Sequence, residues 1–272
     1  METLNPRLDI NAFWLKVKQA PARVLMLDYD GTLAPFAVRR QDAVPYPGIR
    51  EVLNAIHQGG HTRLVMVSGR WAEDVSPLLG LDHPAEVWGC HGWERLWPDG
   101  RHELAPMAAP AAQGLEEAAH LLGEMAQGNP ELADRWERKP ATVALHYRGM
   151  THDLARQLEQ QVVPGWRELA ARSGLELKPF DGGVELVAPG VDKGRAVTTI
   201  LNETPEAGVA AYLGDDLTDE DAFRALHEDT ASHTRLAVFV RESHRNTLGD
   251  LWLRPPEELL EFLHRWHTEA QG

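Results

Sequence analysis

Cysteine is nearly absent from this chain of 272 residues, in which Cys90 is the single example. One cysteine excludes a disulfide within the chain and is typical of a protein kept in a reducing compartment. Long apolar runs are missing too, so we expect no membrane-spanning helix and no membrane partner. The first twenty residues lack the basic and apolar segments of a secretory signal. Together these absences predict a cytoplasmic protein.

Basic residues are also scarce, since 27 Lys and Arg stand against 41 Asp and Glu, which gives a net charge of −14. Nucleic acids bind clustered positive charge, so we expect no nucleic-acid partner. An anionic small substrate is not excluded, because charges are screened beyond a Debye length of about 8 Å. The length allows one large α/β domain or two smaller ones, and we expect a monomer.

Two aspartates follow a short apolar run near the N-terminus. Val24 to Leu27 predicts a strand buried on both faces of a parallel sheet, and Asp28, Asp30 and Gly31 come directly after it. Open α/β sheets bind ligands at the carboxyl ends of their strands. Carboxylates buried there repel each other and lose hydration, which a divalent cation or a protonated aspartate would offset. An ordinary acidic turn is the alternative, because Asp and Gly are common turn residues.

Hydrophobic spacing predicts that strands and helices alternate along most of the chain, as in a doubly wound parallel sheet. The predicted elements are helix 7–20, strand 24–27, helix 49–56, strand 62–67, strand 86–89, helix 193–201, strand 208–213, strand 236–240 and helix 256–267.

The alternation of buried strands and helices is interrupted between residues 106 and 187. This region predicts an Ala-rich helix, a half-exposed strand, a second helix and two short strands, over residues 106–128, 140–147, 154–169, 175–178 and 184–187. Strands covered by helices on one side indicate a small α+β insertion rather than more parallel sheet.

Polar residues stand at the predicted ends of strands and at one helix start. They are Asp28, Asp30, Ser68, Asp215, Asp216, Asp219 and, at the helix start, Lys193. Carboxylates in this number suit Mg²⁺, and a Ser-Gly turn can bind an oxyanion. Each feature alone is equally a turn or a helix start, since Asp219 and Glu220 fit the acidic first turn of a helix. Their recurrence favours an active site.

Four motifs in this order make the sequence similar to the haloacid dehalogenase superfamily of phosphatases. They are DYDGT at 28–32, VSGR at 67–70, DKG at 192–194 and GDDLTDED at 214–221. The resemblance implies a doubly wound α/β core over residues 1–107 and 188–272. It also implies an inserted α+β cap over residues 108–187 that selects the substrate.

The resemblance also implies roles for single residues. Asp28 resembles the nucleophile that accepts the phosphoryl group, and Asp30 the acid and base that moves protons. Ser68 and Lys193 would hold phosphate oxygens. Mg²⁺ would be held by Asp28, Asp30, Asp215, Asp216 and Asp219, and among the last three the direct ligands and the orienting residues stay open.

The cap region narrows the resemblance to trehalose-6-phosphate phosphatases. ERKP at 137–140, HYR at 146–148 and Glu185 are similar to that family's cap, as are SGRWAED at 68–74 and HGWE at 91–94 to its core. The implied substrate is a sugar phosphate, trehalose 6-phosphate. Substrate-binding residues would be Gly69, Arg70, His91, Glu137, Lys139, His146, Arg148 and Glu185.

Two alternatives to this substrate and activity stay open. One is a phosphatase acting on sucrose 6-phosphate or a glycosylglycerate phosphate. The other is a catalytically silent regulator that binds a sugar phosphate.

Overall fold

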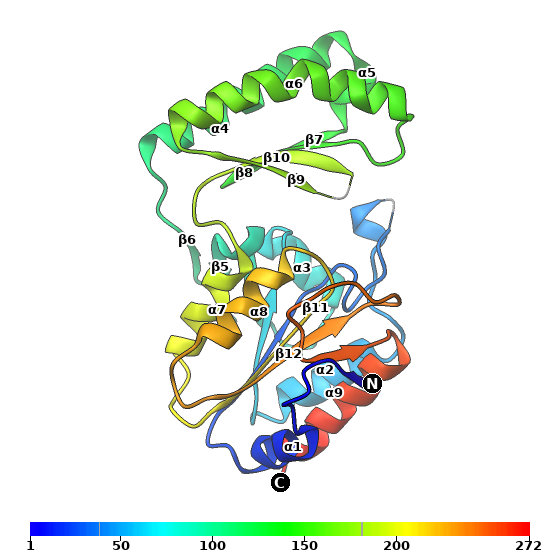
Figure 1. Cartoon of the computed structure of the whole chain (residues 1–272), viewed down its shortest axis with the longest axis vertical. Helices are drawn as coiled ribbons and strands as arrows, with labels where there is room; N and C mark the ends of the chain where they lie inside the picture. Colours follow the sequence, from blue (N-terminus) through cyan, green and yellow to red (C-terminus); the bar gives the residue numbers. More distant parts are fainter. Residues whose placement is uncertain (38, 181) are drawn as a thin grey trace. The chain divides into compact units, whose positions relative to one another are not determined.

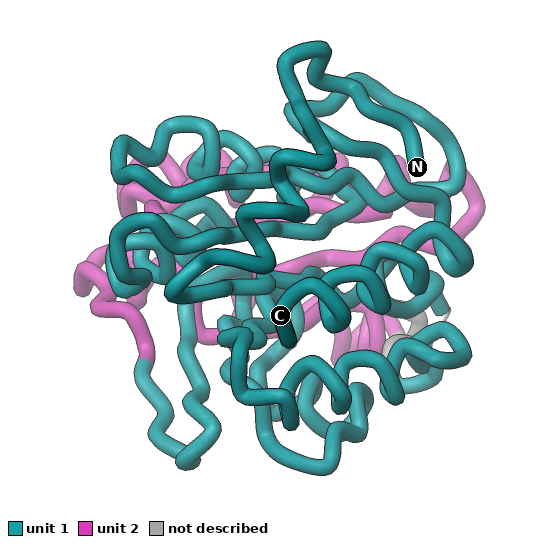
Figure 2. Tube along the Cα trace, turned by 90° about the horizontal axis from the view of Figure 1, so that it is seen from below, with its two compact units in different colours: residues 1–103, 192–272 teal, residues 104–191 magenta. Residues whose placement is uncertain are grey.

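The computed structural model describes residues 1–37, 39–180 and 182–272, which form two compact units (Figure 2). Unit 1 comprises Met1–Glu103 and Asp192–Gly272, and unit 2 comprises Leu104–Val191. The functional division predicted at residues 107/108 and 187/188, into catalytic core and cap, stays a prediction.

Unit 1 is built on a sheet whose strand order, within the described residues, is β1-β13-β12-β11-β2-β3-β4-β5-β6 (Figure 1). The strands from β13 to β4 run parallel, whereas β1 and β5 pair antiparallel at either side. Their bounds are β1 (Glu2–Thr3), β2 (Arg23–Leu27), β3 (Arg63–Val67), β4 (Glu86–Gly89), β5 (Glu94–Leu96), β6 (His102–Leu104), β11 (Val209–Gly214), β12 (Thr234–Val240) and β13 (Leu251–Leu253).

Helices cover both faces of this sheet, which confirms the doubly wound α/β prediction. On one face Leu25 and Leu27 of β2 join a core with helices α1 (Ile10–Gln19), α2 (Ile49–Gln58), α3 (Ala72–Leu79) and α9 (Glu257–Ala270). On the other, Val24 and Met26 pack against α7 (Lys193–Asn202) and α8 (Asp219–Glu228). The central strands are therefore buried on both faces, as their continuous apolar runs predicted.

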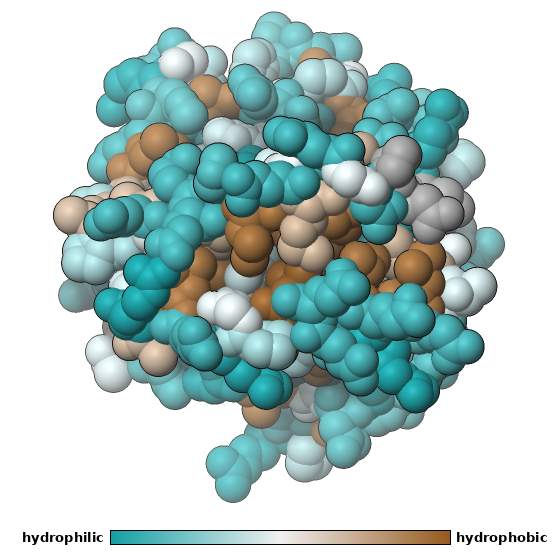
Figure 3. Space-filling view, turned by 90° about the horizontal axis from the view of Figure 1, so that it is seen from above, coloured by the Kyte–Doolittle hydropathy of each residue, from teal (hydrophilic) through white to brown (hydrophobic). Residues whose placement is uncertain are grey.

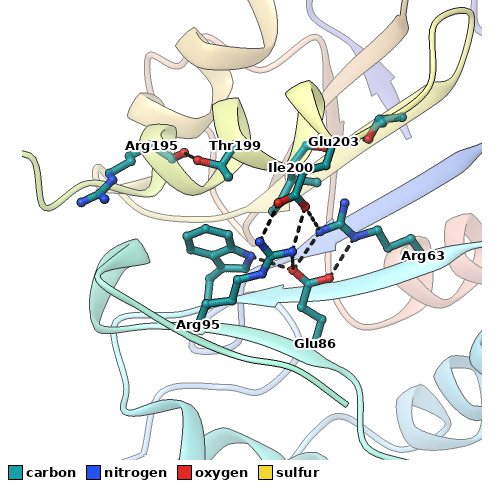
Figure 4. Close-up of polar contacts among 9 residues, drawn as sticks. Arg63, Glu86, Arg95, Arg195, Thr199, Ile200 and Glu203 are labelled. Carbon is teal, nitrogen blue, oxygen red and sulfur yellow. Dashed lines mark hydrogen bonds and ion pairs between the residues drawn. The ribbon is translucent and has the colours of Figure 1, made fainter. Parts of the chain in front are cut away.

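A network of four charged residues ties α7 to the sheet at the amino ends of β3 and β4 (Figure 4). Arg63 donates to Glu86 and Glu203, and Arg95 of β5 pairs with the same two carboxylates. Arg95 also lies over the Trp88 and Trp97 rings. Because Glu203 caps the C-terminus of α7, the network fixes that end of the helix.

Unit 2 is an α+β fold, as the change of pattern predicted. Its antiparallel sheet has the order β7-β8-β10-β9. Its elements are α4 (Ala109–Gly128), α5 (Pro130–Ala133), β7 (Trp136–Lys139), β8 (Thr142–His146), α6 (His152–Ser173), β9 (Glu176–Phe180) and β10 (Gly183–Val187). The long helices α4 and α6 lie on one face of this sheet (Figure 1).

The helical face of unit 2 is polar at its margin, where hydrophilic side chains surround hydrophobic ones (Figure 3). Both helices are amphipathic and bury residues such as Leu115, Leu122, Leu158 and Trp166. Among the described residues, no helix is long and apolar enough to cross a membrane.

Candidate active site

Three neighbouring strands of unit 1 bring their polar ends together. The sheet places β3, β2 and β11 side by side and parallel, so their carboxyl ends meet at one edge. Asp28 follows β2, Ser68 follows β3 and Asp215 follows β11. All three side chains are buried, with Asp28 only 3% exposed. The apolar strands that predicted this sheet thus also place the predicted site.

A buried acidic cluster forms at this edge. Among the described residues, Asp28, Asp215 and Asp219 offer carboxylate oxygens within 4.8 Å of one another. Lys193, the first residue of α7, donates from Nζ to Asp28 Oδ1 at 2.6 Å and to Asp219 Oδ1 at 2.7 Å. Two of the three carboxylates therefore share one ammonium group.

Asp219 is held by several further donors. Its Oδ2 accepts hydrogen bonds from the backbone N–H groups of Asp215 (3.1 Å) and Asp216 (2.9 Å). The buried Tyr212 hydroxyl donates to Oδ1 at 2.6 Å. Asp219 thus orders the acidic loop from the start of α8, a role that fits a carboxylate at a helix N-terminus.

The electrostatics of the cluster favour the binding of a cation. Burial raises the pKa of Asp28 to about 7, although the Lys193 ammonium lowers it. The pKa of Asp215 is raised to about 9 by burial and by the charges of Asp28 and Asp219. Burial lowers the pKa of Lys193, but the two carboxylates outweigh this and raise it. A bound cation would favour the ionised forms of Asp28 and Asp215.

The residues present fit a magnesium ion. Carboxylate oxygens are the ligands that Mg²⁺ prefers, and Asp215 Oδ1 is buried without a hydrogen-bond partner among the described residues. The backbone also leaves room here, since a Cβ at Gly31 would lie 2.2 Å from Asp215 Oδ2. Gly31 has φ of +84°, so the DYDGT turn requires glycine for both space and conformation.

The second aspartate of the motif lies in a different environment. Asp30 has a side chain that is 27% exposed, and both its oxygens accept hydrogen bonds from Arg70, each at 2.6 Å. Asp28 instead accepts from Lys193 and, at 3.2 Å, from the Thr32 hydroxyl. The two carboxylates are thus placed for different tasks.

The Ser68–Arg70 turn is braced by the segment that follows β4. Cys90 N–H donates to the Arg70 carbonyl at 2.7 Å, and His91 N–H to the Ser68 carbonyl at 2.9 Å. Both donors adopt left-handed backbone angles, with φ of 49° at Cys90 and 56° at His91. A Cβ at Gly69 would lie 2.5 Å from the His91 ring. The left-handed backbone of Cys90 and His91 is unfavourable for non-glycine residues, and strain of this kind is characteristic of functional sites.

Not every predicted residue joins the acidic cluster. The Asp216 backbone binds Asp219, but its side chain is not among the clustered carboxylates, and the Asp30 side chain binds Arg70. Tyr212 supports the site although no motif includes it, and Thr32 and Tyr29 support it from within DYDGT although neither was assigned a role. A hydroxyl inside a buried apolar strand, as in Tyr212, was the available signal, since such groups need a hydrogen-bond partner.

In unit 2, four of the five predicted residues share one face of the sheet. Glu137 Oε2 lies 3.8 Å from both Lys139 Nζ and His146 Nε2. Glu185 joins them because it and Glu137 flank Ala144 on opposite sides of β8. Arg148 lies in the turn after β8, where its backbone carbonyl accepts a hydrogen bond from Arg135.

Strand alternation adds one cation that no motif identified. Lys178 of β9 is the register partner of Glu185, on the same face. Burial raises the pKa of Glu185, while Lys139, Lys178 and His146 lower it. This face carries acceptors and donors side by side, the combination that binds sugar hydroxyls.

The model of the family described as "Trehalose-phosphatase" matches residues 26–253, which include every motif named above. The chain belongs to the trehalose-phosphatase family. It is 31% identical over 256 residues to the trehalose-phosphate phosphatase of Mycobacterium marinum (strain ATCC BAA-535 / M). That match covers 90% of this chain and 61% of the relative, and the chain spans 18% to 61% of the length of the further curated relatives.

Solved structures show the same fold. The C-terminal domain of the C. albicans trehalose-6-phosphate phosphatase matches with a TM-score of 0.78 and 21% identity, covering 98% of this chain and 99% of that one. A haloacid dehalogenase-like hydrolase from Bacteroides thetaiotaomicron matches with a TM-score of 0.60 and 18% identity, covering 90% and 99%. This chain therefore has the fold that the resemblance predicted.

Proposed function

We propose that this protein is a Mg²⁺-dependent phosphatase that hydrolyses trehalose 6-phosphate to trehalose and phosphate. The observation that supports this most is the buried Asp28 carboxylate, held by Lys193 beside Asp215 at the edge of a trehalose-phosphatase fold. We further propose that residues 1–107 and 188–272 perform the chemistry and residues 108–187 select the sugar. A cytoplasmic, monomeric enzyme fits this role.

The proposed first step is attack by Asp28 on phosphorus. Lys193 orients Asp28 through Oδ1, and Thr32 through Oδ2. As the bond from Asp28 to phosphorus forms, the bond to the sugar oxygen breaks and Asp30 gives that oxygen a proton. Ser68 and Lys193 bind the other phosphate oxygens, where charge accumulates.

The second step hydrolyses the aspartyl-phosphate. Asp30, now a carboxylate, takes a proton from water as the water oxygen bonds to phosphorus and the Asp28 oxygen departs. Mg²⁺ would be held by the carboxylates of Asp28 and Asp215 and by the Asp30 backbone carbonyl, and it would supply positive charge that stabilises the phosphoryl group. Asp219 orients the acidic loop through its two backbone contacts.

The sugar is proposed to bind the polar sheet face of unit 2. Glu137 and Glu185 would accept hydrogen bonds from sugar hydroxyls, and Lys139 would donate to them. Lys178 lies beside Glu185 and extends the same face. His146 packs edge-on against Phe180, with ring centroids 5.3 Å apart, which gives this face an apolar margin.

Phosphate release from a substrate panel tests the proposal. The panel contains trehalose 6-phosphate, sucrose 6-phosphate, a glycosylglycerate phosphate, glucose 6-phosphate and an aryl phosphate, each with Mg²⁺ and with a chelator. We expect trehalose 6-phosphate to give the highest kcat/KM, and the chelator to abolish turnover.

The Asp28→Asn variant should fold normally and lose turnover by at least about 10⁴-fold, since it lacks the nucleophile. Substantial activity in this variant would exclude Asp28 as nucleophile. Equal kcat/KM for trehalose 6-phosphate and glucose 6-phosphate would refute the proposed substrate. Binding without any turnover would instead identify a silent regulator.

A further inference from the structure

Arg70 is an arginine that the structure attaches to a catalytic aspartate. Its side chain is only 6% exposed, and Nε and Nη2 donate to Asp30 Oδ2 and Oδ1, both at 2.6 Å. A bidentate fork of this kind fixes the plane of a carboxylate as well as its position. A single ammonium group would leave the carboxylate free to rotate.

Arg70 is itself held in place through its backbone and through its guanidinium group. Its N–H donates to Ser68 Oγ at 3.1 Å, and its carbonyl accepts from Cys90 N–H at 2.7 Å. The guanidinium lies over the Tyr29 ring, 5.4 Å from the centroid, and the Tyr29 hydroxyl donates to the Ala43 carbonyl at 2.6 Å. A side chain anchored at so many points belongs to the scaffold of the site.

The pairing leaves Asp30 able to act. Each carboxylate oxygen can accept two hydrogen bonds, and the guanidinium uses one on each. With 27% of its side chain exposed, Asp30 still has a free edge that a leaving oxygen or a water molecule can approach. If Arg70 bound the phosphate through Nε and Nη2 instead, both bonds to Asp30 would have to break.

We propose that Arg70 is a positioning residue for Asp30, which aims that carboxylate at the leaving oxygen, and that it does not bind the substrate. This rests on the proposed function, because it concerns the proton that Asp30 gives while the bond from phosphorus to the leaving oxygen breaks. A displaced Asp30 would slow the reaction most for those substrates whose leaving group most needs a proton. Sugar alkoxides need it, whereas 4-nitrophenolate departs unaided.

The test compares leaving groups in Arg70→Lys and Arg70→Gln. Rapid-mixing experiments measure the rate of phosphoenzyme formation from 4-nitrophenyl phosphate, phenyl phosphate and trehalose 6-phosphate. We expect phosphoenzyme formation to fall about 100-fold with trehalose 6-phosphate, to fall by an intermediate factor with phenyl phosphate, and to fall less than about 5-fold with 4-nitrophenyl phosphate. KM should change little for all three.

Three outcomes would overturn the role of Arg70. One is an equal loss of rate for every leaving group, and the second is a rise in KM shared by all substrates, which is the sign of phosphate binding. The third is full activity in Arg70→Lys, which keeps the charge but not the fork. Wild-type protein that forms no phosphoenzyme from any substrate would refute the proposed function instead. Tyr29→Phe, which removes only the anchoring hydroxyl, should show the same leaving-group trend more weakly.

Discussion

At the scale of single residues, the environment separates two aspartates that the sequence places two positions apart. Asp28 is buried against Lys193, and Asp30 is more exposed and paired with Arg70. The motif and its resemblance predicted both aspartates. The Arg70–Asp30 pair and the Tyr212 contact could not be predicted, because they depend on side-chain directions that no strand pattern specifies. The Arg70–Asp30 pair also joins residues 40 positions apart in the sequence.

Lys139 provides a residue-scale prediction about substrate selection. It is 4% exposed and shares its face of β7 with Glu137, whereas Arg138 points to the opposite face and donates to Glu116 of α4 at 2.8 Å. Lys139→Met should lower kcat/KM for trehalose 6-phosphate by about 10- to 100-fold, as expected for losing a charged hydrogen bond to the sugar. Hydrolysis of 4-nitrophenyl phosphate should stay within about 3-fold.

Arg138→Met is the matched control, because it removes a cation from the same strand but from the opposite face. Its ratio of sugar-phosphate to aryl-phosphate kcat/KM should stay at the wild-type value. A similar change of this ratio in both variants would place Lys139 outside the sugar site.

At the scale of elements, the buried strands were predicted well, whereas a short helix without a local N-cap was not. The apolar runs at 24–27 and 208–213 closely match β2 and β11. Helix α3 was not predicted, since the side chain of its N-cap residue Trp71 makes no capping hydrogen bond and Pro77 lies inside the helix. The N-terminus of α3 is capped instead by a residue distant in sequence, because Glu94 Oε1 accepts a hydrogen bond from Ala72 N–H at 2.6 Å. A distant cap of this kind leaves no local signal.

The charged network shown in Figure 4 gives an element-scale prediction about stability. The Glu86 side chain is 7% exposed and binds Arg63, Arg95 and the Trp88 indole N–H, whereas Glu203 is 39% exposed. Glu86→Ala should lower the free energy of unfolding by about 3 kcal/mol, because it removes the more buried of the two carboxylates that pair with Arg63 and Arg95. Glu203→Ala should cost about 1 kcal/mol, since solvent screens its pairs.

Urea denaturation of both variants measures the difference, and Glu86→Gln tests whether charge or shape matters. Because the network lies at the amino ends of β3 and β4, folded variants should keep wild-type kcat. Equal losses of stability in Glu86→Ala and Glu203→Ala would contradict the greater burial of Glu86 as the cause.

At the scale of the whole molecule, the change from parallel to alternating hydrophobic patterns predicted an inserted α+β segment, and unit 2 is that segment. The sheet register then decides which residues share a face, so that Lys178 joins Glu185 although it belongs to no motif. The register of β9 and β10 could not be predicted from the sequence, because the pattern of residues 175–187 indicates two strands but not how they align.

The acidic cluster makes the stability of the whole molecule depend on pH and metal. Burial raises the pKa of Asp28 to about 7 and that of Asp215 to about 9, from 3.8 for both. The unfolded chain therefore releases these protons first as pH rises. Asp28 between about pH 4 and 7, and Asp215 between about pH 4 and 9, each lower the free energy of unfolding by up to about 1.4 kcal/mol per pH unit.

We therefore expect the Tm of chelator-treated protein to fall as pH rises from 6 to 9. Mg²⁺ binds the ionised carboxylates, so the Tm increase that it causes should be larger at pH 9 than at pH 6. Scanning calorimetry at four pH values, with and without Mg²⁺, measures both effects. A metal-induced Tm increase that does not vary with pH would contradict this account.

Asp215→Asn separates the cluster from other titrating groups. His227 also loses stabilisation as pH rises, because its hydrogen bond to Asp250 raises its pKa above 6.5 in the folded state. The His227 contribution should survive in Asp215→Asn, whereas the further loss of Tm between pH 7 and 9 should shrink and the response to Mg²⁺ should disappear. If Asp215→Asn kept the full pH dependence and the full response to Mg²⁺, neither could arise from the cluster at the end of β11.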